Sequence, residues 1–348
     1  MPSLITPKAA AANETMSHEY VLGIDVGGTD VKVGLFDYEG QIVASDRTPT
    51  PSLGTPIAVF EHALRFGNNA LGAEKTATSK DHCQITAVGL AVPGVLDQAT
   101  CQLKEVVNLP GWLNVPLLDQ MQAQTGLPCA VLNDANAAAL AEHAMRNLGH
   151  QSLGLVTLGT GIGCGLVLGG RPHGGDHGCA GELGHIAIDF GDAAWPCTCG
   201  SRGHLETYAG AAGVQRRLKD RIADGVAANE PADITPREIA RRAEAGDPDC
   251  IATIRETAAY VGRAIGMLCQ NVDPAVVLLG GAMTFGGPDR PTGRKFLDDV
   301  IAEVRATTLV QVGTQVTIDF ASLKNNAGMI GAAKFASLAA QIDHDAHH

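Results

Sequence analysis

Short hydrophobic runs alternate with glycine-rich joints through the first part of the chain. Residues 20–26 and 31–37 are rich in Val, Ile and Leu, and the segment 27–30 (GGTD) separates them. Two such runs around a short glycine turn predict a β-hairpin. The pattern further predicts strands near 41–46 and over 85–92 and 130–132, and helices over 56–71 and 115–125.

The second part of the chain repeats this pattern. Residues 153–158 and 165–168 form a second predicted hairpin around the segment 159–163 (GTGIG). The segments 21–35 and 154–168 share an apolar strand, a turn of Gly and Thr and a second apolar strand, although few residues are identical. Two related α/β lobes, each with a glycine turn at its strand ends, suggest a ligand held between them. The remaining predicted elements are helices over 210–223, 236–245, 247–271, 295–307 and 327–340 and strands over 275–279 and 315–320.

Glycine is the unusual component of the composition. Of 348 residues, 42 are glycine and only 4% are aromatic, which leaves a low-complexity chain or many tight turns as interpretations. No Gly-X-Y period runs through the sequence, and the glycines are interleaved with Val, Leu and Ile runs. Collagen is therefore excluded, and we expect tight turns in which the backbone approaches something closely.

The charge balance narrows the possible partners. The formal net charge is −12, so we expect no general affinity for nucleic acid or for an anionic membrane. No apolar run reaches the ~18 residues that span a bilayer, and the first residues lack the pattern of a secretory signal. We expect disordered tails over 1–19 and 342–348. Seven of the nine cysteines are isolated and are expected to be free thiols in a reducing cytoplasm.

Both glycine turns have the composition of a phosphate-binding site. Backbone N–H groups can reach a phosphate only where side chains do not block the approach, which glycine and a small hydroxyl residue allow. Asp25, beside the first turn, could in addition hold a hydrated Mg²⁺. The alternative is a pair of tight hairpins without a ligand; the Walker and dinucleotide fingerprints are both absent. The candidate phosphate-binding residues are Gly27, Gly28 and Thr29 in the first turn and Gly159, Thr160 and Gly161 in the second.

An acid stands where a predicted strand turns into a helix. Asn133 and Asp134 follow the strand over 130–132 and precede an alanine-rich segment. A carboxylate there can take a proton from a substrate hydroxyl during phosphoryl transfer, which depends mostly on positioning and charge neutralisation. The alternative, which these residues alone favour, is that Asp134 only caps the helix.

Thiols and imidazoles cluster in one glycine-rich segment. Cys197, Cys199 and His204 fall within eight residues, and His185 lies twelve residues before Cys197. Two thiolates and two imidazoles are a tetrahedral zinc set. A strained Cys197–Cys199 disulfide and an inert loop are the alternatives. Four protein ligands leave no open position, so zinc would shape this loop without activating water.

Together, these segments resemble the ROK family within the actin-like sugar-kinase superfamily. The likeness covers about residues 20–340. It implies an α/β, two-lobed actin-like (ribonuclease H-like) fold with the active site in the interlobe cleft. The small lobe would span 20–134 plus the C-terminal helix 326–341, and the large lobe 135–325 with a zinc loop over 185–206. The motifs are DVGGT (25–29), VPGVLD (92–97), NLPGW (108–112), NDANAAALAE (133–142), LGTGIGCGLVL (158–168), GELGH (181–185), CTCGSRGHLE (197–206), LLGGAM (278–283) and AGMIGAAKFA (327–336).

The resemblance implies an ATP-dependent hexose kinase that uses Mg²⁺ and a structural Zn²⁺. Asp134 matches the general base for the 6-hydroxyl of the sugar. Glucose is the expected substrate, with N-acetylglucosamine, N-acetylmannosamine and fructose as alternatives, because the sugar-hydroxyl residues are shared among these. The residues that match the sugar side are Gly94, Asn108, Asn133, Asp134, Glu182, His185 and Glu206, and those that match the nucleotide side are Gly28, Thr29, Thr160, Gly280 and Gly281.

One position departs from the family's pattern. The family's frame has a third cysteine where this chain has His204, so the expected zinc ligands are His185, Cys197, Cys199 and His204. His185 would also touch the sugar.

A transcriptional repressor and a sugar-binding sensor are the competing functions. Repressor members of the family carry an N-terminal helix-turn-helix, whereas only 24 residues precede Asp25 here, so we expect an enzyme. A sensor is disfavoured because Asp25, Asp134 and both turns are intact. The resemblance also implies a cytoplasmic homodimer, and the apolar faces of helix 247–271 predict burial between lobes or subunits.

Overall fold

Two five-stranded sheets of identical topology follow one another along the chain in the computed structural model, which describes residues 18–78, 83–106, 109–224 and 234–346. Each has three antiparallel strands followed by two parallel ones, in the orders β3-β2-β1-β4-β7 and β10-β9-β8-β11-β12. The predicted hairpins and their repetition are thus confirmed. The strands are β1 (His18–Val26), β2 (Asp30–Phe36), β3 (Ile42–Pro49), β4 (Cys83–Val92) and β7 (Cys129–Asn133), then β8 (Leu153–Leu158), β9 (Ile162–Leu168), β10 (Arg171–Pro172), β11 (Val276–Gly280) and β12 (Thr317–Phe320), with a separate pair β5 (Val95–Leu96) and β6 (Leu103–Glu105).

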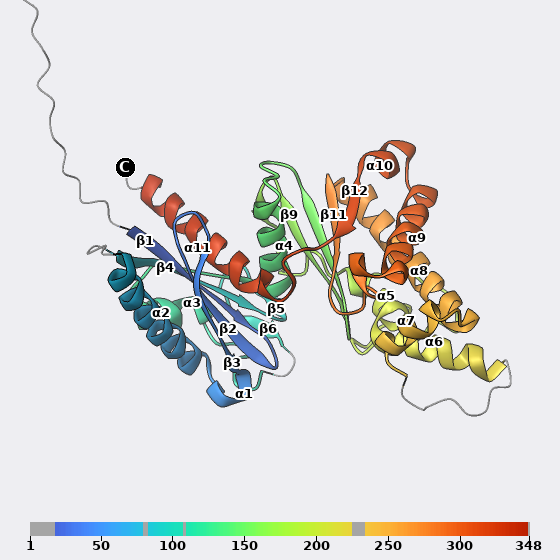
Figure 1. Cartoon of the computed structure of the whole chain (residues 1–348), viewed down its shortest axis with the longest axis horizontal. Helices are drawn as coiled ribbons and strands as arrows, with labels where there is room; N and C mark the ends of the chain where they lie inside the picture. Colours follow the sequence, from blue (N-terminus) through green and yellow to red (C-terminus); the bar gives the residue numbers. More distant parts are fainter. Residues whose placement is uncertain (1–17, 79–82, 107–108, 225–233, 347–348) are drawn as a thin grey trace, which may run out of the picture.

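Helices cover both faces of each sheet (Figure 1). The first sheet has α2 and α3 on one face and α11 on the other, and the second sheet has α4 on one face and α5, α8 and α9 on the other. The helices are α1 (Thr50–Leu53), α2 (Pro56–Thr78), α3 (Leu117–Thr125), α4 (Asp134–Met145), α5 (Leu205–Ala209), α6 (Ala211–Asp224), α7 (Pro236–Glu244), α8 (Pro248–Val272), α9 (Pro291–Thr307), α10 (Val310–Gln315) and α11 (Ala327–Ala346), with short 3₁₀ turns η1 (Leu183–His185), η2 (Gly287–Asp289) and η3 (Lys324–Asn326).

Both expected tails are shorter than predicted. His18 and Glu19 continue the parallel pairing of β1 with Cys83 and Gln84 of β4, so they belong to the sheet. At the other end α11 continues to Ala346, beyond the predicted limit at 341, because no glycine or proline interrupts the helix there. The remainder of the predicted tails lies outside the described residues.

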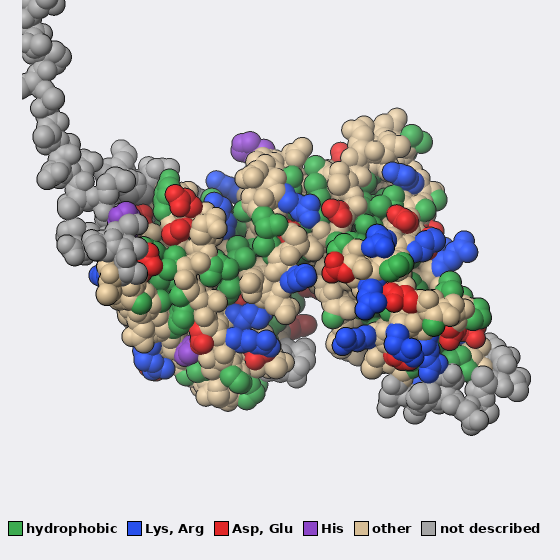
Figure 2. Space-filling view, viewed as in Figure 1, with side chains coloured by type: hydrophobic (Ala, Val, Ile, Leu, Met, Phe, Trp, Pro, Cys, Tyr) green, Lys and Arg blue, Asp and Glu red, His purple; other side chains and the backbone are tan. Residues whose placement is uncertain are grey.

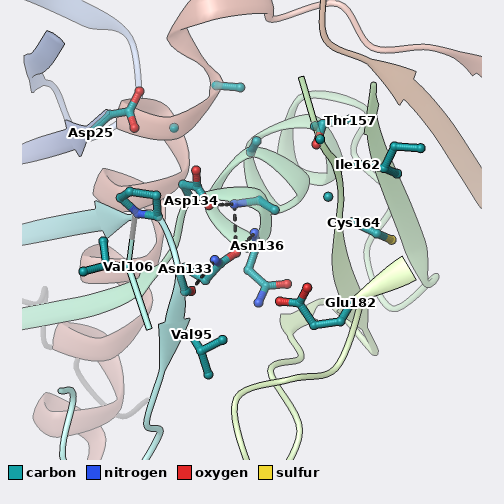
Figure 3. A pocket seen from close by; sticks show the side chains of 18 of the residues that line it. Asp25, Val95, Val106, Asn133, Asp134, Asn136, Thr157, Ile162, Cys164 and Glu182 are labelled. Carbon is teal, nitrogen blue, oxygen red and sulfur yellow. Dashed lines mark hydrogen bonds between the residues drawn. The ribbon is translucent and has the colours of Figure 1, made fainter. Parts of the chain in front are cut away.

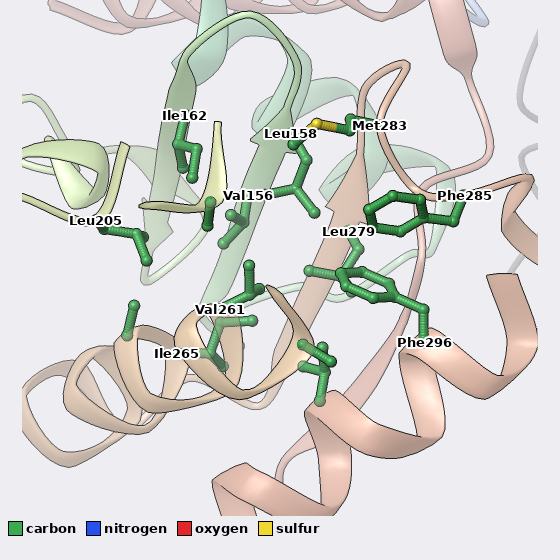
Figure 4. Close-up of a cluster of buried hydrophobic side chains, with 14 of the residues drawn as sticks. Val156, Leu158, Ile162, Leu205, Val261, Ile265, Leu279, Met283, Phe285 and Phe296 are labelled. Atoms are coloured by element: carbon green, nitrogen blue, oxygen red, sulfur yellow. The ribbon is translucent and has the colours of Figure 1, made fainter. Parts of the chain in front are cut away.

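The two halves have separate hydrophobic cores. Alternation along β1 sends Leu22 and Ile24 toward α2 and α3, where they are fully buried with Phe60 and Met121. In the second half, the core joins the sheet to α8 and α9, with Val156 and Phe296 among its members (Figure 4). Central strands of both halves, such as β4 and β8, are nearly continuous hydrophobic runs, as expected for sheets that are covered on both faces.

Helix α8 lies inside the second half. Its buried positions pack in that half's core with α5, α6, α7 and α9. The prediction that this segment is buried was right, but the alternative that placed it between the lobes was wrong, because other helices of the same half cover most of its apolar positions. A contact of this helix with a second subunit stays a prediction. Asp247 caps its start and accepts hydrogen bonds from the backbone of Asp249 and Cys250.

Glycines allow the two central helices to approach the sheets closely. A Cβ atom added at Gly89 would lie 1.9 Å from the carbonyl oxygen of Ala332 on α11, and one added at Gly165 would lie 2.0 Å from that of Ala135 on α4. At Gly331 the same atom would lie 1.8 Å from the carbonyl oxygen of Ala137, where α11 crosses α4. Part of the glycine excess therefore serves helix packing as well as turns.

The surface is deeply notched between the two halves (Figure 2). α4 and α11 cross at the base of this notch and join the halves. None of the helices in the described segments is both long enough and apolar enough to cross a membrane.

Candidate active site

A cavity of about 670 Å³ lies between the two halves, and both contribute to its wall (Figure 3). From the first half come the end of β1, the segment after β4 and the end of β7, and from the second come β8, β9 and the loop before η1. The α/β architecture thus directs strand ends and helix starts into one space, where ligands of such folds bind. The predicted site residues that line it are Asp25, Gly94, Asn133, Asp134, Gly161, Glu182, His185 and Glu206.

Other predicted residues lie outside this lining. They are Gly27, Gly28, Thr29, Gly159, Thr160, Gly280 and Gly281, all assigned to the nucleotide from the sequence. Asn108 falls outside the described residues.

Asp134 is the first residue of α4 and points into the cavity (Figure 3). Its pKa is raised to about 6, first by burial and then by the negative charge of Asp25, with a smaller contribution from Glu182. The backbone N–H of Ala135 donates to its Oδ1 at 2.8 Å and partly opposes this rise. Asp134 is therefore a carboxylate with an unusually high proton affinity.

Asn133, not Asp134, caps helix α4. The Asn133 Oδ1 accepts hydrogen bonds from the backbone N–H groups of Ala135 and Asn136, at 2.9 and 3.1 Å, and its Nδ2 donates to the carbonyl oxygen of Gly94 at 3.0 Å. Asp134 is therefore not the N-cap residue, although its Oδ1 also accepts a hydrogen bond from the Ala135 N–H. Because the neighbouring amide satisfies the helix start, the carboxylate of Asp134 is left facing the cavity.

Asp25 is buried at the carboxyl end of β1 and is paired with Lys32. The Lys32 Nζ lies 3.0 Å from Asp25 Oδ2, and the two residues stand opposite one another in the β1–β2 ladder. Gly328 also packs against this carboxylate, since a Cβ there would lie 2.5 Å from the Asp25 Cγ. The ion pair occupies one carboxylate oxygen, and the second could ligate a hydrated cation.

The first glycine turn is braced by Thr50. The Thr50 Oγ1 donates to the carbonyl oxygen of Gly27 at 2.6 Å, and the Thr50 N–H donates to that of Thr29 at 2.8 Å. The Gly27 N–H donates to the Asp30 carbonyl at 2.9 Å, while Gly28 and Thr29 are exposed. The turn thus presents exposed backbone at its tip without relying on a ligand for its shape.

Glu206 braces the second glycine turn. Its Oε2 accepts a hydrogen bond from the Ile162 N–H at 2.9 Å, and a Cβ at Gly161 would lie 2.4 Å from the same oxygen. Any side chain at Gly161 would therefore displace the carboxylate. Gly281 is held at φ 90°, and a Cβ there would lie 2.2 Å from the Leu158 carbonyl oxygen just before this turn, so the two glycine segments are packed together.

The predicted zinc ligands converge. One donor atom from each of His185, Cys197, Cys199 and His204 can be chosen so that all four lie within 4.8 Å of one another. Both cysteines are free thiols, so the alternative of a Cys197–Cys199 disulfide is wrong. Two thiols and two imidazoles at this spacing fit a closed tetrahedral Zn²⁺ site.

Hydrogen bonds and stacking fix the loop over 185–206 to the second half. The Tyr208 hydroxyl donates to Asp189 Oδ2 at 2.6 Å and accepts from the Trp195 N–H at 2.8 Å. The Trp195 ring stacks on Tyr208, with 4.8 Å between centroids, and Arg216 covers its other side. His204 is also the N-cap of α5, which carries Glu206. The loop therefore leads directly into a helix that forms part of the cavity wall.

Several residues of the cavity wall were missed from the sequence. Lys32, Glu105, Asn136 and Lys324 all line it. The hairpin register, which places residues 25 and 32 opposite one another, could have indicated Lys32. Asn136 lies on α4 and accepts from the Leu166 N–H at 2.9 Å, a contact between distant segments that carries no local signal.

Comparison with known proteins places the chain among sugar kinases. It is 30% identical to a glucokinase from Halalkalibacterium halodurans over 91% of this chain and 94% of that protein. It is also 30% identical to an N-acetylmannosamine kinase from Escherichia coli O1:K1, over 90% and 97% of the two chains.

Solved structures of sugar kinases are also similar to this chain. A ROK hexokinase from Thermus thermophilus is 31% identical and superposes with a TM-score of 0.74, covering 93% of this chain and 99% of that one. A ROK family glucokinase from Streptomyces griseus, solved with glucose and AMPPNP, is 29% identical with a TM-score of 0.67, covering 92% and 99%. The fold is therefore the two-lobed actin-like one that was expected. The ROK family model matches residues 21–339, and this chain belongs to the ROK family.

Proposed function

We propose that the protein transfers the γ-phosphoryl group of ATP to the 6-hydroxyl of a hexose, with glucose as the preferred substrate. The observation that carries the proposal is Asp134, a carboxylate of raised pKa that points into the interlobe cavity and is not needed as a helix cap. The two braced glycine turns and Asp25 support it, because they offer backbone donors and a metal ligand to a nucleotide.

In the proposed reaction, the sugar O6 attacks the γ-phosphorus while the bond from that phosphorus to its bridging oxygen breaks. Asp134 takes the hydroxyl proton, and the electron pair of the broken bond leaves with ADP. A group with a pKa of about 6 is mostly ionised at pH 7, yet it holds a proton more strongly than an ordinary aspartate. Both properties suit a general base.

Glu182, His185, Asn133 and Glu206 are assigned to the sugar hydroxyls. Glu182 and His185 line the cavity from the second half, opposite Asn133. Asn133 and Glu206 are already held by hydrogen bonds, so each can offer its remaining polar atoms in a fixed position. Asn108 is assigned to the sugar and Gly27, Gly28, Thr29, Gly159, Thr160, Gly280 and Gly281 to the nucleotide, from the family resemblance.

Two cofactors accompany this proposal. Mg²⁺, bound at Asp25, would neutralise charge on the transferred phosphoryl group. Zn²⁺ on His185, Cys197, Cys199 and His204 would hold the loop that positions Glu182, His185 and Glu206. We also propose a cytoplasmic homodimer, for which light scattering of the purified protein gives the mass directly.

An ADP-release assay over a panel of hexoses tests the function. We expect turnover to be highest with glucose and Asp134→Asn to reduce it by about 10³-fold. N-acetylmannosamine, N-acetylglucosamine and fructose belong in the panel, because relatives with the same identity carry different names. Failure of every hexose to raise ADP release above the Asp134→Asn background would reject the proposal. A clear preference for an N-acetylhexosamine would replace glucose and keep the chemistry.

A further inference from the structure

Lys324 occupies an unusual backbone conformation at the cavity wall. Its φ is 49°, in the left-handed region that favours glycine. Five other non-glycine residues of the described segments have positive φ, and three of those are Asn or Asp, which tolerate it. Among these six positions, only Lys324 lines the interlobe cavity.

A buried carboxylate holds this conformation in place. Glu142 on α4 is fully buried and accepts hydrogen bonds from the backbone N–H groups of Ser322 and Leu323, at 2.6 and 2.7 Å, and from the Ser322 hydroxyl at 2.9 Å. Arg146 donates to the Phe320 carbonyl at 3.0 Å. The segment leading to Lys324 is thus clipped to α4, and the strained residue follows directly. Strain that surrounding contacts maintain in this way is characteristic of functional positions.

The charge of the cavity favours a further cation. Carboxylates of Asp25, Asp134, Glu182 and Glu206 line it, and a nucleotide would add the negative charges of its polyphosphate. Lys32 is paired with Asp25, whereas Lys324 makes no ion pair within the described residues. The segment after Lys324 reaches Asp25, because Gly328 packs against that carboxylate. Lys324 therefore stands near the expected position of the phosphates.

We propose that the Lys324 ammonium group binds the polyphosphate chain of the nucleotide. This inference rests on the proposed function, since it takes ATP as the ligand of the cavity. A lysine is a compact cation on a flexible stem, which suits a phosphate contact from an exposed position. The strained backbone is then retained because it directs this side chain into the cleft.

Calorimetric binding of Mg-AMPPNP and of adenosine tests the proposal. Lys324→Met should weaken AMPPNP binding about tenfold, the size expected for a contact to a charged group, and leave adenosine and glucose binding unchanged. Lys324→Arg should retain most of the AMPPNP affinity. Lys334→Met is the matched control, because Lys334 is an exposed lysine on α11 outside the cavity lining, and it should bind like the wild type.

Lys324→Gly separates the effect of losing the ammonium group on nucleotide binding from any effect on stability. Glycine adopts positive φ without strain, so this variant should melt at a higher temperature than the wild type and still lose AMPPNP affinity about tenfold. Wild-type AMPPNP affinity in either Lys324→Met or Lys324→Gly overturns the proposal, as does an equal loss for AMPPNP and adenosine. The readout needs no hexose, so a protein that binds AMPPNP but phosphorylates no sugar would contradict the proposed function alone.

Discussion

At the scale of single residues, Asp134 has the position and proton affinity of a general base. Burial and the charge of Asp25 raise its pKa to about 6. Because the base must be ionised, we predict that kcat/KM for the sugar falls about tenfold per pH unit below pH 6 and is level above it. Initial rates across pH 4.5–8 measure this acidic limb of the pH profile, the fall of kcat/KM below pH 6.

The prediction requires that the fall of kcat/KM below pH 6 is caused by protonation of Asp134. A profile that stays flat down to pH 4.5 would contradict the assignment. The residual activity of Asp134→Asn is the control, since it should lack the limb altogether. Circular dichroism at each pH separates titration of the base from unfolding.

Also at the residue scale, the sequence could predict which residues meet but not all of their roles. Asp25, Asp134, Glu182 and His185 line one cavity, as expected from motif order. Asn133 is the N-cap of α4, which the sequence alone did not distinguish from Asp134. The choice between two adjacent cap-forming residues depends on the angle at which the strand enters the helix. Lys324 was missed because its backbone conformation is imposed by Glu142, which is 182 residues away in sequence and adjacent in space.

At the scale of elements, the hairpins and most helices could be predicted because their signals are local. Periodicity and glycine turns mark the β1–β2 and β8–β9 hairpins within a few residues. The location of α8 within one half depends on which helices cover it, and so on contacts between distant segments. The glycines at helix–sheet contacts fall within predicted strands and a predicted helix, and their packing role could not be predicted for the same reason.

Two glycines with opposite surroundings test that packing. Gly89→Ala would place its Cβ 1.9 Å from the Ala332 carbonyl oxygen, and since backbone must move, we predict a loss of about 3 kcal/mol in the free energy of unfolding. Gly72→Ala, in the exposed face of α2 with no atom within 4 Å of the added Cβ, should gain about 0.5–1 kcal/mol. Urea unfolding of both variants measures the two values. Equal effects would show that helix–sheet proximity does not decide the cost.

The zinc loop makes its own prediction at the element scale. Cys197→Ser removes one of the four proposed zinc ligands, so the purified variant should hold no stoichiometric zinc. Because the loop carries residues that we propose bind the sugar, KM for glucose should rise about 10–100-fold while KM for ATP changes little. Metal analysis and two-substrate kinetics provide both readouts. Cys179→Ser, an exposed free thiol outside the cluster, is the control; a stoichiometric zinc content in Cys197→Ser would exclude this ligand set.

At the scale of the whole molecule, the repeated sheet topology explains why the site is where it is. Each half offers strand ends and a glycine turn to the notch between them. α4 and α11 link the halves and cross where Gly331 meets Ala137. Asp134, the proposed base at the start of α4, and Glu142 near its end are therefore parts of one helix, which packs on the second sheet, so both residues would move with the second half.

A ligand that touches both walls of this cavity should draw the halves together. The residues proposed to bind the sugar lie on both halves, with Asn133 at the end of β7 in the first and Glu182 and His185 in the second, so contact with all of them favours a closed arrangement that also excludes water. We predict that glucose lowers the radius of gyration in small-angle X-ray scattering and that AMPPNP lowers it further. Asp134→Asn, which cannot turn over, is the suitable protein for the experiment with ATP. A scattering curve unchanged at glucose concentrations that saturate binding by calorimetry would mean that the halves are already in their catalytic arrangement, and water would then have to be excluded by the bound substrates themselves.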